Sequence, residues 1–142
     1  MRTRSARLAI GAGLLGAVLV ASAAAFASAQ QGPSPVTSVE IVVHYSNFEP
    51  SEITVPVGVP VTITLRNDDP IDHEWIVGDE VVHAIHRVGT EPLHPDRPTE
   101  VVLPALSTRT TVVTFESTGS LQFICHLPLH ESYGMVGQVT IR

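Results

Sequence analysis

Apolar and polar residues alternate along most of the chain after residue 38, in short runs separated by turn-forming residues. In Val61-Thr62-Ile63-Thr64-Leu65, the apolar side chains would share one face of an extended strand and the threonines the other. Eight such runs occur, at 39–45, 52–57, 61–66, 74–77, 100–103, 109–116, 121–125 and 136–141. No stretch repeats apolar residues every three to four positions for long enough to predict a substantial helix. The pattern predicts an all-β, single-domain antiparallel β-sandwich of the Greek-key type, with about eight strands.

One segment, from Gly78 to Pro98, interrupts this alternation. It is rich in acidic residues and contains three histidines, His83, His86 and His94. We expect a long loop excursion from the sandwich, in which 81–87 is the stretch that suits a turn of helix. Long loops inside compact domains often carry function, although a solvated surface is the commoner outcome.

The first 29 residues have the pattern of a secretory signal peptide. Three arginines lie within the first seven positions, residues 8–27 are almost wholly small or apolar, and Ala27-Ser28-Ala29 is an A-x-A cleavage site. The alternative is a retained membrane anchor, because a bilayer span needs about 20 apolar residues. The richness in Ala and Gly and the cleavage site favour removal.

Cleavage there would leave a mature chain that begins at Gln30. We expect a linker over 30–38 and the folded domain over 39–142, in a protein that is periplasmic, bound at the cell surface or secreted. We expect no stable membrane insertion after cleavage.

The charge of the mature chain restricts its partners. Its 113 residues would contain five Arg, no Lys and 14 acidic residues, a formal net charge of −9 with neutral histidines. Such a chain is repelled by nucleic acids and anionic membranes. Its length suits one domain and excludes a multidomain enzyme. With a single Cys, it cannot form an intramolecular disulfide, so the thiol of an exported protein needs another explanation.

That Cys belongs to a motif of potential metal ligands, Cys125-x4-His130-x4-Met135, whose Met is the only one after the signal peptide. Thiolate, imidazole and thioether together are a known ligand set for copper. Cys125 ends a predicted strand, and a loop stiffened by Pro128 and turned by Gly134 can bring the other two side chains back over its sulfur. The same residues also occur singly as core filler or surface residues, but such roles do not explain their joint spacing.

His73 is the best candidate for the fourth ligand. It opens the predicted strand after the turn at 67–70, a position at one end of a sandwich. One thiolate sulfur and two imidazole nitrogens in a plane, with a weak axial thioether, are typical of an electron-transfer copper site.

These residues resemble the cupredoxins, the blue copper proteins that include plastocyanin, azurin, auracyanin and rusticyanin. The resemblance covers roughly 39–142 and includes Asn47-Phe48-Glu49-Pro50-Ser51-Glu52-Ile53-Thr54-Val55, Gly58 and the closing window through Gly137. The loop spacing looks like that of auracyanin and rusticyanin. The resemblance implies one type 1 copper, held by His73, Cys125, His130 and Met135.

One position departs from the family's pattern. Family members often have Asn or Ser after the first His ligand, whereas this chain has Glu74. A carboxylate next to a thiolate would be repelled, so we expect the side chain of Glu74 to point away from Cys125.

The expected function is therefore that of an exported one-electron carrier, monomeric, with transient redox protein partners. It is not expected to be an enzyme, because a multicopper oxidase needs a His directly before the Cys, where Ile124 stands, and needs further domains. A second hypothesis is a copper-handling protein that buffers or delivers the ion. In that case His83, His86 and His94 would form an accessory site. His126 should point to the opposite face from Cys125 and have a structural role.

Overall fold

The computed structural model describes residues 37–89 and 97–142, and these contain nine strands, one α-helix and one short 3-10 helix. The strands are β1 (Ser38–His44), β2 (Asn47–Glu49), β3 (Glu52–Val55), β4 (Pro60–Asn67), β5 (His73–Gly78), β6 (Glu100–Leu103), β7 (Thr108–Thr114), β8 (Gly119–Ile124) and β9 (Val136–Ile141). The helices are α1 (Glu80–Arg87) and η1 (Glu131–Tyr133).

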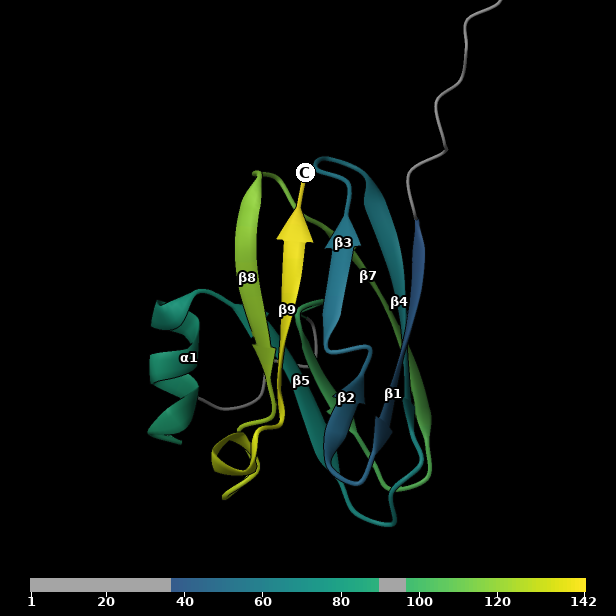
Figure 1. Cartoon of the computed structure of the whole chain (residues 1–142), viewed down its shortest axis with the longest axis vertical. Helices are drawn as coiled ribbons and strands as arrows, with labels where there is room; N and C mark the ends of the chain where they lie inside the picture. Colours follow the sequence, from purple (N-terminus) through teal and green to yellow (C-terminus); the bar gives the residue numbers. More distant parts are fainter. Residues whose placement is uncertain (1–36, 90–96) are drawn as a thin grey trace, which may run out of the picture. The chain divides into compact units, whose positions relative to one another are not determined.

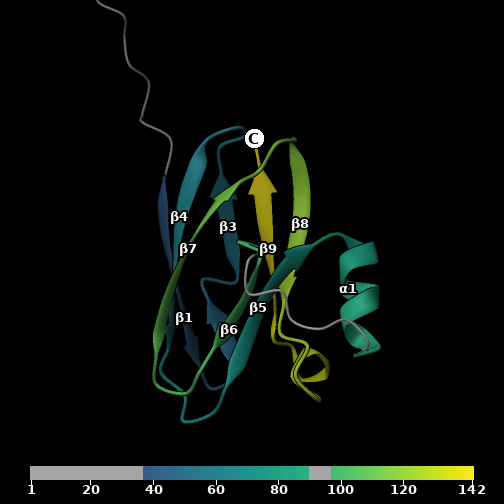
Figure 2. The same ribbon diagram turned by 180° about the vertical axis from the view of Figure 1, so that it is seen from behind.

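The strands form two sheets that pack face to face (Figures 1 and 2), with the orders β2-β1-β4-β7 and β3-β9-β8-β5-β6. The predicted β-sandwich is confirmed, but its pairing is mixed rather than wholly antiparallel, since β1 pairs with β4 and β3 with β9 in parallel. The chain crosses between the sheets after β2, and β3 continues the direction of β2 before β4 reverses it. For this reason β4 runs parallel to β1, which alternation along each strand cannot reveal.

All eight predicted runs contain a strand, with ends displaced by a few residues. The additional strand, β2, has only three residues and buries only Phe48. Ser38 already belongs to β1, one residue before the predicted start of the domain. The predicted signal peptide 1–29 and most of the linker 30–38 lie outside the described residues, so cleavage before Gln30 stays a prediction. None of the helices in the described part of the chain is long and apolar enough to cross a membrane.

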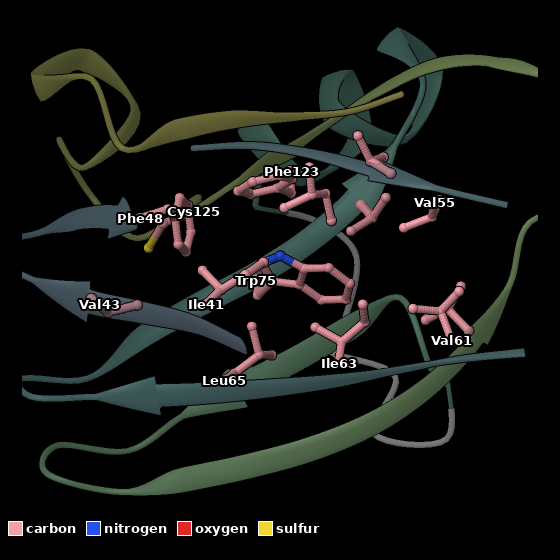
Figure 3. Packing of buried hydrophobic residues seen from close by; sticks show 14 of the residues in the cluster. Ile41, Val43, Phe48, Val55, Val61, Ile63, Leu65, Trp75, Phe123 and Cys125 are labelled. Atoms are coloured by element: carbon pink, nitrogen blue, oxygen red, sulfur yellow. The ribbon is translucent and has the colours of Figure 1, made fainter. Parts of the chain in front are cut away.

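The hydrophobic core lies between the two sheets, where every second residue of β4 is buried. Trp75 and Phe123 are its largest fully buried side chains, with ring centroids 6.1 Å apart. Figure 3 shows Cys125 beside Phe48 at one end of this cluster, with Val55 and Val61 at the other. The thiol is therefore placed where core packing ends and loops begin.

Strand β5 is buried along its whole length, because the core covers one of its faces and α1 packs against the other. Helix α1 lies outside the sandwich, beside β5 and β8 (Figures 1 and 2). The carboxylate of Asp79 caps the helix by accepting hydrogen bonds from the backbone N–H groups of Val81 and Val82. A Cβ at Gly78 would lie 2.5 Å from Cβ of Val82, so the turn into α1 requires glycine. The excursion predicted at 78–98 thus contains an eight-residue helix.

Candidate metal centre

His73, Cys125 and His130 meet at one end of the sandwich, and their ligand atoms all lie within 4.8 Å of one another. Nδ1 of His130 is 3.2 Å from Sγ of Cys125 and 3.3 Å from Nδ1 of His73. His73 and Cys125 are fully buried, whereas His130 is partly exposed. Three separate parts of the fold thus meet at one point: the first residue of β5, the residue after β8 and the loop before β9.

Backbone hydrogen bonds fold this loop back over the thiol. The N–H of Cys125 donates to the carbonyl of Met135 at 3.2 Å, and the N–H of Met135 donates to the carbonyl of His130 at 3.0 Å. Gly134 makes the turn possible, because its φ of 94° lies in the left-handed region. Met135 is fully buried in the same hydrophobic cluster as Cys125. All four residues singled out in the sequence therefore lie at this end of the fold.

The thiol of Cys125 is held in a dry environment. The backbone N–H of Glu74 donates to its sulfur at 3.3 Å. Burial raises the pKa of Cys125 to about 11, so the thiol keeps its proton at neutral pH unless a cation displaces it. Trp75, the next residue of β5, points into the core between the sheets, so the side chain of Glu74 lies on the other face of the strand. This side chain therefore points away from the sulfur, as expected.

Asp69 is a residue of this centre that the sequence did not reveal. Its Oδ2 accepts hydrogen bonds from Nε2 of His73 at 3.0 Å and from the backbone N–H of Ser46 at 2.7 Å. Its Oδ1 accepts from the backbone N–H of Tyr45 at 2.8 Å. Burial opposes ionisation of this carboxyl, but the hydrogen bonds from Ser46 and Tyr45 outweigh it, and the pKa of Asp69 is lowered. In the sequence, the only indication of this role is that Asp69 lies in a turn, four residues before His73.

The bond to Asp69 fixes the tautomer of His73. Because Nε2 carries the proton that points at the carboxylate, Nδ1 presents a lone pair to Cys125 and His130. Burial lowers the pKa of His73, so its ring is neutral at pH 7. A thiol and two imidazoles that converge in a dry pocket form a set of one soft and two borderline donors. This set fits a type 1 copper site.

The predicted accessory site of His83, His86 and His94 stays a prediction, although the first two histidines already have hydrogen-bond partners. His83 has no free ring nitrogen, since Nε2 lies 3.1 Å from the carbonyl of Gly78 and Nδ1 lies 3.0 Å from Nε2 of His126. His86 donates from Nδ1 to the carbonyl of Val82 at 2.9 Å. His94 lies outside the described residues. His126 faces away from Cys125, as expected, and contacts both helix histidines under α1.

Two curated proteins similar to this chain are named copper-resistant cuproprotein CopI. The one from Pseudomonas aeruginosa is 28% identical, with 91% of each chain covered. The one from Rubrivivax gelatinosus is 33% identical over 67% of this chain and 59% of its own length.

Solved structures of auracyanins share the fold. Auracyanin from the photosynthetic bacterium Roseiflexus castenholzii has 26% identity and a TM-score of 0.64, covering 75% of this chain and 97% of its own. Auracyanin A, a blue copper protein from Chloroflexus aurantiacus, has 23% identity and a TM-score of 0.59, covering 74% and 98%. The model of the cupredoxin-like domain family matches residues 14–141. This chain therefore belongs to the cupredoxin-like family.

Proposed function

We propose that this protein is a mononuclear type 1 copper protein that carries single electrons between redox partners outside the cytoplasm. The observation that carries the proposal is the convergence of one thiol and two imidazoles, with 3.2 and 3.3 Å between neighbouring donor atoms. His73, Cys125, His130 and Met135 would hold the copper. Copper bound there would supply one-electron chemistry by alternating between its two oxidation states.

The protein's own contribution is to keep the donor atoms still. Asp69 holds the ring of His73 in one tautomer, and the N–H of Glu74 is directed at the sulfur of Cys125. Both contacts come from backbone or side chains that are themselves buried. A site that needs little rearrangement when its charge changes suits rapid electron transfer, because reorganisation adds to the barrier.

His130 would be the exit route for the electron. It is the partly exposed ligand, and the loop around it presents the exposed side chains of Leu129 and Tyr133. A small apolar rim supports brief contacts with a redox protein, because a limited contact area favours fast release. We expect no catalytic turnover at this site.

The primary test is an absorption spectrum of the mature protein after addition of Cu²⁺. We expect an intense visible band from thiolate-to-copper charge transfer, and we expect Cys125→Ser to abolish it, because the chain has one thiol. His44→Gln, a change at an exposed histidine, is the control and should leave the band intact. An undiminished band in the Ser variant would show that the thiolate is not a ligand.

Electron transfer itself needs a kinetic assay. We expect mixing of the copper-loaded protein with a small reduced redox protein to bleach the visible band. Leu129→Glu should slow this reaction without altering the spectrum, since the side chain is exposed on the rim beside His130. Equal rates for both proteins would mean that this rim is not the contact surface.

A second candidate function is copper handling, which the similarity to the two CopI proteins favours. A carrier should retain its copper when challenged with a metal-free chelator at moderate concentration, whereas a buffering or delivery protein should release it quickly. The rate of band loss under this challenge distinguishes the two functions.

A further inference from the structure

A second group of polar side chains is buried behind the metal centre, between α1 and the outer face of the β5–β8 sheet. In this sheet Ile76 lies opposite both Glu100 and Ile124, so Glu100 points to the same face as α1. His126, the neighbour of Cys125, reaches this face from the end of β8. The side chains are almost fully enclosed, with exposed fractions of 5% for His86, 2% for Glu100 and 3% for His126.

The hydrogen bonds of His83 fix the tautomer of His126. Nε2 of His83 faces two backbone carbonyls, those of Gly78 at 3.1 Å and Gln122 at 3.3 Å, and must therefore carry the proton. Nδ1 of His83 then has only a lone pair, and it accepts the proton on Nε2 of His126 at 3.0 Å. Nδ1 of His126 is left with a bare lone pair.

That lone pair has no hydrogen-bond partner. Oε2 of Glu131 lies 3.5 Å from Nδ1 of His126, but it is also an acceptor. The guanidinium of Arg87 donates to the carboxylates of Glu131 and Glu80 instead.

His86 also has a buried ring nitrogen, Nε2, without a hydrogen-bond partner. Its Nδ1 donates to the carbonyl of Val82 at 2.9 Å, and in the neutral ring Nε2 then carries only a lone pair. That atom faces Oε2 of Glu100 at 3.7 Å, too far for a hydrogen bond. Oε1 of Glu100 accepts from Arg97 at 2.7 Å, whereas Oε2 has no partner.

Three buried acceptor atoms therefore lack a donor: Nε2 of His86, Nδ1 of His126 and Oε2 of Glu100. The rings of His86 and His126 stack with centroids 5.6 Å apart. Each unsatisfied buried acceptor costs about 1–3 kcal/mol, and a cation would convert all three into ligands. A nitrogen–oxygen separation of 3.7 Å is close to that of two ligands about 2.1 Å from one shared ion.

We propose that this cluster is a second metal site, which takes a borderline divalent cation such as Zn²⁺ through His86, His126 and Glu100. His83 is a positioning residue, because it directs the lone pair of His126 into the site. Two imidazoles and a carboxylate are a ligand set that suits zinc. Among residues 37–89 and 97–142 only the first centre has all its ligand atoms within 4.8 Å, so the second site must close by side-chain rotation when the ion enters.

The test begins with the mature protein loaded with one Cu²⁺ per chain to fill the first centre. This protein is dialysed against Zn²⁺, freed of excess ion, and assayed for both metals by elemental analysis, while the visible band is monitored. We expect about one retained zinc per chain and an unchanged band. If the wild type retains no zinc, or retains it only with loss of the band, the proposal is wrong.

Substitutions of the proposed ligands test which side chains bind the zinc ion. His86→Gln and Glu100→Gln should each weaken zinc binding at least about tenfold in calorimetric titrations. The matched controls are His44→Gln and Glu116→Gln, at exposed positions, and these should bind zinc like the wild type. Wild-type affinity in both ligand variants would overturn the assignment. Zinc retention by the Cys125→Ser protein separates this site from the first centre, so failure of the proposed function leaves this test intact.

Discussion

Asp69→Asn is the substitution that best tests how the fold prepares His73 for metal binding. The carboxylate accepts hydrogen bonds from two backbone N–H groups of the β1–β2 turn and from the ring of His73. An asparagine has the same shape but only one acceptor oxygen. In its better orientation the oxygen replaces Oδ2 and keeps Ser46 and His73 as donors, while the amide NH₂ faces the N–H of Tyr45.

The expected loss of stability follows from this geometry. One hydrogen bond to a charged group is lost, at about 1.5–3 kcal/mol, and two others lose their charge assistance. We therefore expect the free energy of unfolding of the copper-free protein to fall by about 2–4 kcal/mol. Domains of this kind are stable by about 5–15 kcal/mol, so the variant should still fold.

The same substitution should change the copper centre without removing a ligand. A carboxylate that accepts the ring N–H makes the imidazole of His73 a stronger electron donor, which favours the more highly charged ion. An amide in its place should raise the reduction potential and weaken metal affinity, while the visible band survives because Cys125 is unchanged.

The assay combines urea unfolding of the copper-free protein with voltammetry of the loaded protein. Asp68→Asn is the matched control, because it removes the same charge from the neighbouring exposed residue, whose ion pair with Arg66 lies at the surface. If Asp69→Asn and Asp68→Asn gave the same unfolding free energy within about 0.5 kcal/mol and the same potential, the bond to Asp69 would not be what positions His73.

Two further predictions concern the ligands themselves. Met135→Leu keeps the side-chain volume and removes the axial thioether, so voltammetry should show a higher reduction potential with the visible band retained; an unchanged or lower potential would exclude Met135 from the coordination sphere. Copper loading at pH 7 should release about one proton, measured with an indicator dye, because burial raises the pKa of Cys125 to about 11 and the thiol must ionise to bind. His73 should release none, because its lowered pKa leaves it neutral. The same release from Cys125→Ser would contradict the second prediction.

The sandwich could be predicted because strand alternation records burial directly. Every second residue of β4 points into the core, and the sequence shows this as Val61, Ile63 and Leu65 separated by polar residues. Alternation does not show whether two neighbouring strands run parallel or antiparallel, because a strand buries the same face in both cases. The parallel β1–β4 and β3–β9 pairs therefore emerged only in the structure.

The first metal centre could be predicted because most of its ligands come from one loop. Cys125, His130 and Met135 are close in sequence, so their spacing carries the signal. Asp69 could not be recognised, because its backbone donors, Tyr45 and Ser46, lie 24 and 23 residues away. An aspartate in a turn is common, and only the packing of the β1–β2 turn against it distinguishes this one.

Helix α1 explains why the second cluster was not visible in the sequence. Its buried face carries His83 and His86, whereas its apolar stripe of Val81, Ile85 and Val88 is exposed. The sequence suggested a turn of helix here, but an apolar stripe normally marks the face that packs inward, so the buried histidines could not be recognised. Because His94 is close to His83 and His86 in sequence, we expected these three to form a site. In the structure His83 and His86 both contact His126. The alternation of β8 sends Cys125 inward and His126 outward, to the face that α1 covers. A helix that buries imidazoles and exposes aliphatic side chains gains little from the hydrophobic effect, so its packing here requires polar partners beneath it, and a bound cation would supply what the bare nitrogens lack.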